Sequence, residues 1–219
     1  KCRISGKLAL GIFSSGLPSL ITEVSSGIVM IVFNTIILGI AGNIGVAAYG
    51  VIANLSLVVM SIYTGISQGI QPLLSSGYGT GNRKKTQSVL RYALVSAVLI
   101  SVVVYVCVFF GADPIAAVFN SEQNATLQSI AVTGLKIYFT ACVFAGFNII
   151  LSVYFTSTEN ALPAHIISIL WGFVVIIPMA FLLSAAAELT GVWAAFPATE
   201  LIVSLIGAGL FFRIGKRTE

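Results

Sequence analysis

The chain has 219 residues, of which 58% are hydrophobic and only 8% are charged, and its mean hydropathy is +1.04. A soluble domain has about 25% charged residues, so a water-exposed globular domain is excluded and a membrane protein is indicated. The formal net charge of +4 comes from short basic segments at the edges of apolar stretches. This pattern excludes a nucleic-acid-binding surface, which would gather its charge on one folded face.

Six apolar stretches are long enough to cross a membrane as helices. Each supplies the ~20 residues needed to span a hydrocarbon core, and a helix satisfies its own backbone amides within lipid. The expected spans are about 12–40, 46–74, 88–112, 130–156, 163–187 and 190–212. The fold class is therefore predicted as an all-α membrane protein with six transmembrane helices.

In the first span, polar and small residues share one helical face. They are Ser19, Glu23, Ser26, Gly27, Met30 and Asn34. An ionisable residue deep in a span is a functional hypothesis by default, because a charge is costly there. Burial favours the neutral carboxyl, so Glu23 is predicted to exchange a proton or to bind Na⁺. The alternative is a protonated Glu that donates a structural hydrogen bond.

The second span carries a polar stripe and then enters the glycine-rich, basic stretch 68–85. The stripe consists of Asn54, Ser61, Gly65, Gln68 and Pro72, with Thr64 and Gln71 beside it. It is expected either to line a cavity or to hydrogen-bond to neighbouring helices. The glycine spacing fits neither a Walker phosphate loop nor a dinucleotide-binding loop. Residues 68–85 are therefore interpreted as a helix end, a flexible glycine turn and a basic membrane anchor.

The fourth and sixth spans add further polar groups. Asn148 shares a face with Ser152, and Glu200 shares a face with Pro197 and Ser204. At about 1.5 Å of rise per residue, Glu23, Asn148 and Glu200 lie about 16, 15 and 20 Å from the cytoplasmic ends of their spans. They are expected to meet near the membrane midplane, where transporters built from repeats bind their substrates. Alternatively, Glu200 satisfies backbone groups that the Pro197 kink frees.

Ten of the eleven basic residues lie on one side of this six-span arrangement. They are Lys1, Arg3, Lys7, Arg83, Lys84, Lys85, Arg91, Arg213, Lys216 and Arg217, and Lys136 lies on the other side. By the positive-inside rule, both ends are predicted to be cytoplasmic in a multi-pass protein of the plasma (inner) membrane. The chain begins at Lys1 without a signal-peptide pattern and is interpreted as a piece of a longer protein.

No metal or catalytic motif is visible in the sequence. It has no H-E-x-x-H, and its three cysteines lack the spacing of metal ligands. A membrane-embedded enzyme would need such a cluster or a pair of catalytic aspartates. Trp171 and Trp193 are expected to be interfacial anchors or packing residues.

Four segments resemble a known family of transporters. They are GLPSLITEVSSGIVMIVFN (16–34), the pattern GI-x-QG-x-QPL-x₄-YG-x-GN (65–82), FNIILSVYFTSTENALPA (147–164) and GVWAAFPATE (191–200). They are similar to the C-terminal half, helices seven to twelve, of a multidrug and toxic compound extrusion (MATE) transporter. The resemblance implies two six-helix lobes that face a central cavity and expel organic, often cationic, compounds in exchange for Na⁺ or H⁺.

The resemblance also implies site residues. In some members, a Glu in the first helix of this half and an Asp in the fourth form a cation site. Glu23 matches the first position, and Asn148 takes the second, where its amide oxygen can serve as a ligand to Na⁺. Glu23 and Asn148 are thus predicted to couple the cation. The predicted substrate cavity comprises Asn34, Asn54, Gln68, Gln71 and Glu200.

The predicted function is the C-terminal lobe of a cation-coupled multidrug antiporter. Residues 1–219 form a single six-helix lobe, and the N-terminal partner lobe is expected outside the chain. The expected partners are small-molecule substrates, the lipid bilayer and that N-terminal lobe. No catalytic residue, no organic cofactor and no metal other than Na⁺ at Glu23 are expected. The alternatives are a flippase for lipid-linked precursors with a related fold and a passive channel subunit.

Overall fold

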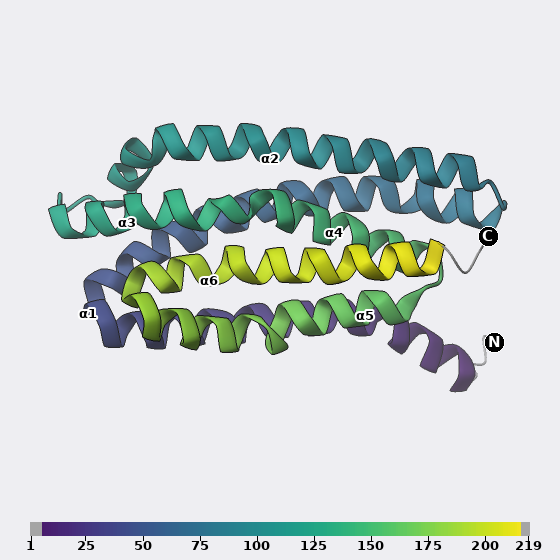
Figure 1. Cartoon of the computed structure of the whole chain (residues 1–219), viewed down its shortest axis with the longest axis horizontal. Coiled ribbons are helices and arrows are strands. Elements are labelled where there is room, and N and C mark those ends of the chain that lie inside the picture. The colour runs from purple at the N-terminus through teal and green to yellow at the C-terminus, as the bar shows by residue number, and fades with distance from the viewer. Residues whose placement is uncertain (1–5, 216–219) are drawn as a thin grey trace, which may run out of the picture.

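The structure is a computed structural model that describes the helices of residues 6–215, with side chains between 20 and 213 except at 21, 22 and 161. The elements in order are α1 (Gly6–Gly79), α2 (Arg83–Phe119), α3 (Ala125–Tyr138), the 3₁₀ turn η1 (Phe139–Ala141), α4 (Cys142–Ser157), α5 (Ala161–Ile169), the π turn η2 (Leu170–Val174) and α6 (Ile176–Gly215). Figure 1 shows these helices side by side along the long axis of the molecule.

Four helical stretches are long and apolar enough to cross a membrane. They are Glu23–Gly79, Arg83–Phe119, Ala125–Ser157 and Leu162–Arg213. The prediction of an all-α membrane protein is confirmed on this point. The chain has too few charged residues to give these helices a water-exposed polar surface. In lipid, a helix satisfies its own backbone hydrogen bonds.

Two of these stretches are broken internally, and the chain reverses direction at each break (Figure 1). In α1 the break is at Gly42, with φ 61° and ψ −157°. Glycine adopts this positive φ without a Cβ clash. In α6 the break is at Ala187 (φ −141°, ψ 24°) and Glu188 (φ 48°, ψ −129°). Each break falls at a boundary between two of the predicted spans.

The predicted helix end and turn both lie within the stretch 68–85, but most of this stretch is helix and the turn is short. Helix α1 continues to Gly79, and only Thr80, Gly81 and Asn82 separate it from α2. Asn82 caps α2 by accepting the Lys85 backbone N–H at 3.0 Å. A Cβ at Gly77 would lie 2.6 Å from Thr86 Oγ1, so this glycine allows α1 and α2 to pack closely.

A buried polar contact ties three helices together away from the lipid. The Tyr63 hydroxyl on α1 lies 2.7 Å from Ser101 Oγ on α2. Ser101 Oγ in turn lies 2.6 Å from the Ala97 carbonyl oxygen and 3.1 Å from the Cys142 carbonyl oxygen on α4. A tyrosine hydroxyl needs such a partner when it is buried.

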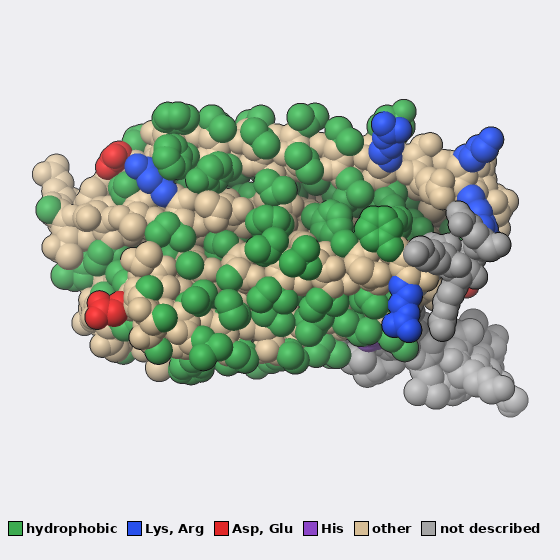
Figure 2. Space-filling model, viewed as in Figure 1, with side chains coloured by type: hydrophobic (Ala, Val, Ile, Leu, Met, Phe, Trp, Pro, Cys, Tyr) green, Lys and Arg blue, Asp and Glu red, His purple; other side chains and the backbone are tan. Residues whose placement is uncertain are grey.

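The outer surface is apolar, and the charges lie near the ends. Large exposed side chains such as Ile31, Phe110 and Leu205 cover the flanks of the bundle. In Figure 2, basic side chains gather toward one end of the visible face, and acidic side chains with one basic group lie toward the other. Four of the predicted orientation residues lie outside the described residues: Lys1, Arg3, Lys216 and Arg217. The side chain of Lys7 also lies outside them.

Candidate functional site

A cavity of about 550 Å³ opens between α1, α3, α4, α6 and the α5–η2 segment. Its polar lining comprises Glu23, Ser26, Tyr49, Ser56, Thr64, Ser67, Gln68, Gln71, Tyr138, Asn148, Ser152, Thr156, Ser168, Trp171 and Glu200. The wall contains two carboxyl groups, and none of the described lining residues is Lys, Arg or His. A concave wall with acidic groups of one sign attracts cations.

Glu200 on α6 forms the centre of a hydrogen-bond network in this wall. Its side chain is only 2% exposed. Asn148 on α4 donates from Nδ2 to Glu200 Oε2 at 2.6 Å and to the Glu200 carbonyl oxygen at 3.0 Å. The Trp171 indole donates to Oε1. Ser204, one turn after Glu200, donates to Asn148 Oδ1 at 3.1 Å.

Trp171 reaches Glu200 from the π turn η2. Such turns accommodate one extra residue within a helical stretch and often occur at functional sites. The Trp171 ring is half-buried and lines the cavity. It is therefore part of the site and does not serve as an interfacial anchor. Its position after Ser168, another lining residue at helical spacing, is the sequence signal that could have identified it.

The structure pairs Asn148 with Glu200, whereas Asn148 was predicted to assist Glu23. Helices α4 and α6 pack directly against each other, and this contact buries both Asn148 and Glu200. Glu23 lines the same cavity from α1 and is exposed. Among the described residues, no group of three or more His, Cys, Asp or Glu side chains is arranged to hold a metal ion. The coupling role of Glu23 stays a prediction.

Glu200 also does not compensate for a kink at Pro197. Helix α6 contains Pro197, but its non-helical residues are Ala187 and Glu188, ten and nine positions earlier. The Glu200 carboxyl accepts its hydrogen bonds from two side chains on other elements. The alternative that it satisfies freed backbone is therefore wrong.

Of the predicted cavity residues on the second half of α1, Gln68 and Gln71 line the cavity and Asn54 does not. Asn54 is exposed, and its amide donates to the Gly50 carbonyl oxygen at 2.8 Å. The lining face centres on Ala53, Met60 and Gln71. At about 100° per residue, this face is turned by roughly 100° from the predicted polar stripe. Apolar residues therefore supply much of the wall, which a search for polar residues does not reveal.

Asn34 is likewise absent from the lining residues. At its level, the inward face of α1 is occupied by Phe33 and Ile37, which are 1% and 0% exposed. The ring of Phe33 stacks on Tyr49 with centroids 5.7 Å apart. Asn34 therefore lies outside the lining of this cavity, and its role in substrate binding stays a prediction.

Aromatic rings form one end of the cavity. Tyr49 lines it and stacks on Trp193 at 6.0 Å between ring centroids. Tyr138 and Phe196 also line it, and their rings stack at 4.5 Å with an angle of 7°. Trp193 is only 1% exposed and is thus a packing residue. Aromatic faces next to acidic groups suit a flat organic cation.

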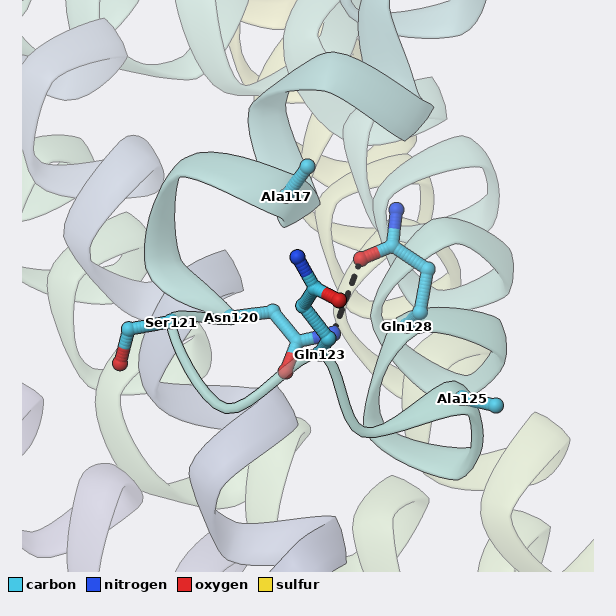
Figure 3. A pocket seen from close by; sticks show the side chains of 6 residues that line it. All are labelled: Ala117, Asn120, Ser121, Gln123, Ala125 and Gln128. Atoms are coloured by element: carbon cyan, nitrogen blue, oxygen red, sulfur yellow. Dashed lines mark hydrogen bonds between the residues drawn. The ribbon is translucent and has the colours of Figure 1, made fainter.

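A second hollow of about 420 Å³ lies at the turn between α2 and α3, and neither Glu23 nor Glu200 lines it. Figure 3 shows its lining, in which Asn120 donates to Gln128 Oε1 at 3.3 Å. Asn120 also donates to the Asn124 carbonyl oxygen at 3.0 Å. These polar groups satisfy one another and hold the turn, and no lining residue is ionisable.

Known proteins resemble this chain along nearly its full length. The MatE family model matches residues 18–182. The chain is 25% identical over 215 residues to the multidrug export protein MepA of Staphylococcus saprophyticus, covering 98% of this chain and 47% of that protein. It is 28% identical over 191 residues to the multidrug export protein MepA of Staphylococcus aureus, and this match covers 87% of this chain and 41% of that protein.

The fold is also similar to a solved structure. This is an outward-facing multidrug resistance MATE family transporter of the MOP superfamily, with a TM-score of 0.87 and 20% identity. The match covers 97% of this chain and 47% of that transporter. The chain thus spans about half the length of the proteins that it matches.

Proposed function

Because the chain belongs to the MatE family, we propose that it forms the C-terminal lobe of a multidrug efflux antiporter. The transporter would export organic, often cationic, compounds in exchange for Na⁺ or H⁺. One observation carries this proposal: a cavity within an apolar bundle is lined by two carboxyl groups and by aromatic rings. An organic cation would gain both Coulombic attraction and cation–π contacts from this wall.

The proposed lobe has six membrane-spanning segments. The breaks at Gly42 and at Ala187–Glu188 divide α1 and the α5–α6 stretch into two arms each. Together with α2 and the α3–α4 stretch, this makes six crossings. A partner lobe is supported by the coverage of about half of each relative. It would cover the side of the cavity where Glu23, Gln68 and Gln71 are exposed.

We assign Glu23 to cation binding and the glutamines to substrate contact. The Glu23 carboxyl is exposed in the cavity, so it can bind a coupling cation and a cationic substrate in turn. Gln68 and Gln71 offer both hydrogen-bond donors and acceptors. Competition of two cations for one carboxylate is the simplest basis for exchange.

The test is efflux of a fluorescent cationic dye by the full-length protein in proteoliposomes. With an imposed H⁺ or Na⁺ gradient, dye should move against its own gradient. Without an ion gradient, it should only equilibrate. If dye moves only down its own concentration gradient, with no dependence on either ion, the protein is a passive channel. That result would contradict the proposed antiport.

The orientation is a separate prediction, since the basic end is proposed to be cytoplasmic. Lys84 in the first turn of α2 and Glu122 in the α2–α3 turn are exposed, and they lie at opposite ends of α2. In a background without native cysteines, Lys84→Cys should react with an impermeant thiol reagent only after the cells are opened. Glu122→Cys should react in intact cells. The opposite labelling pattern would reverse the proposed orientation.

A further inference from the structure

Glu200 is the one buried carboxyl group in the described part of the chain. The other acidic side chains there are exposed: Glu23, Asp113, Glu122, Glu159 and Glu188. A buried charge is costly unless it is paired or neutralised. A buried carboxyl that borders a cavity can lower this cost by taking up a proton.

Among the described residues that line the cavity, no positively charged side chain faces Glu200. The ionisable groups that share its cavity are Glu23 and Tyr49 from α1 and Tyr138 from α3. Cys142 on α4 also lies within its electrostatic reach. The α5–η2 segment contributes only uncharged side chains to the lining. The negative charge of an ionised Glu200 is therefore stabilised by uncharged hydrogen-bond donors alone.

The arrangement of those donors fits a proton better than Na⁺. Both carboxyl oxygens already accept an N–H, one from Asn148 and one from Trp171. A Na⁺ ion needs several oxygen ligands, and N–H groups that point at the carboxylate repel it. The amide oxygen of Asn148, Oδ1, already accepts a hydrogen bond from the Ser204 hydroxyl. A proton needs only one carboxyl oxygen.

The partners of Glu200 differ in how they can respond to that proton. A protonated carboxyl has an O–H that must donate, whereas an indole N–H can never accept. An asparagine amide can present either N–H or C=O, and a serine hydroxyl can donate or accept. If the Asn148 amide turns, Oδ1 accepts from Glu200 and Ser204 accepts from Nδ2. Ser204 can then donate to the Phe144 carbonyl oxygen, which lies 3.4 Å away.

We propose that Glu200 is a proton-binding site of the transport cycle, with Asn148 and Ser204 as the partners that reverse their hydrogen bonds. Glu200 takes a proton from cavity water and returns it to water when the cavity faces the other side. The turned amide on α4 gives up its bond to the Glu200 carbonyl oxygen, and Ser204 on α6 gains the bond to the Phe144 carbonyl oxygen on α4. The contact between α4 and α6 therefore persists in both protonation states with its hydrogen bonds reversed. The Trp171 bond weakens in the same step and frees the π turn. This inference rests on the proposed efflux function and deepens it by naming H⁺ as the ion at this site.

The first experiment detects the proton without relying on transport. Infrared difference spectra of the full-length protein between high and low pH should contain the C=O stretch of a protonated carboxyl. Exposed carboxyl groups contribute bands as well, so the band that matters is the one that differs between the wild type and Glu200→Gln. One carboxyl band of the wild type should be missing in Glu200→Gln and present in Glu23→Gln. If Glu200→Gln keeps every carboxyl band of the wild type, the proposal is overturned.

The second variant keeps the carboxyl and removes one donor. In Trp171→Phe, the ionised carboxylate loses one charge-assisted hydrogen bond. The midpoint of the infrared band should therefore move to higher pH by about one unit. Trp193→Phe is the matched control, because Trp193 is buried against Tyr49, and its midpoint should not move. An unchanged midpoint in Trp171→Phe would contradict the assigned network.

Transport separates this inference from the proposed function. Wild-type protein should drive dye efflux with a pH gradient, and Glu200→Gln should lose that efflux. If a Na⁺ gradient drives dye efflux by the wild type and a pH gradient does not, the proposed efflux function stands and the proton-binding site is refuted. If the wild type moves no dye under either gradient, the efflux function itself fails, and the infrared band still decides whether Glu200 binds a proton.

Discussion

Replacing Glu23 with glutamine is expected to abolish gradient-driven efflux of cationic dyes by the full-length protein. Glutamine keeps the size and hydrogen bonding of the side chain but removes its charge. At about 4 Å and an effective dielectric constant of about 20, a charge pair contributes about 4 kcal/mol. Because Glu23 is exposed, roughly half of this remains, which still corresponds to about thirtyfold in affinity for a cation.

The control for this prediction is Glu122→Gln, an exposed acidic residue at the α2–α3 turn outside the cavity. It should transport at the wild-type rate. Glu23→Asp should retain part of the activity, since the charge remains on a shorter side chain. Glu23→Gln should lose efflux under both the Na⁺ and the H⁺ gradient, whereas Glu200→Gln should lose the efflux that a pH gradient drives. Wild-type efflux by Glu23→Gln under both gradients would leave Glu23 without a coupling role.

Replacing Gly191 with alanine is expected to destabilise the fold by about 3 kcal/mol or more. Gly191 is buried just after the break in α6, where the chain turns back on itself. A Cβ there would lie 1.8 Å from the Leu183 carbonyl oxygen and 2.4 Å from the Leu183 carbonyl carbon. The Leu183 carbonyl is part of the backbone and cannot rotate away as a side chain can. The chain on the two sides of the α6 break must therefore move apart to make room for the Cβ. The midpoint of thermal unfolding of purified protein in detergent measures the effect.

The matched control is Gly209→Ala on the same helix. A Cβ at Gly209 meets nothing within 4 Å, and alanine favours a helix over glycine by about 1 kcal/mol. This variant should unfold at the wild-type midpoint or slightly above it. If Gly191→Ala unfolds at the same midpoint as Gly209→Ala, the close approach at the α6 break does not hold the reversal together.

Hydropathy alone determined the class of this protein and the course of its helices. With 8% charged residues, the chain could only place its backbone in lipid as helices, because lipid offers no hydrogen bonds to an open backbone. The two reversals at Gly42 and at Ala187–Glu188 coincide with gaps between apolar stretches. Period 3.6 shows which residues share a side of one helix, and Gln68 and Gln71 line the cavity as predicted, but the lining face of α1 is turned by roughly 100° from the predicted stripe.

Tertiary structure alone decided which of those polar groups meet. Periodicity describes one helix by itself and does not show which neighbour its face meets. The packing of α4 against α6 therefore joined Asn148 to Glu200, whereas Glu23 lines the same cavity from α1. The π turn brought Trp171 to Glu200. The helical spacing from Ser168 places Trp171 on the lining face but does not show which residue its indole meets. Beside Asn34, the inward position on α1 belongs to the buried Phe33, whose ring stacks on Tyr49.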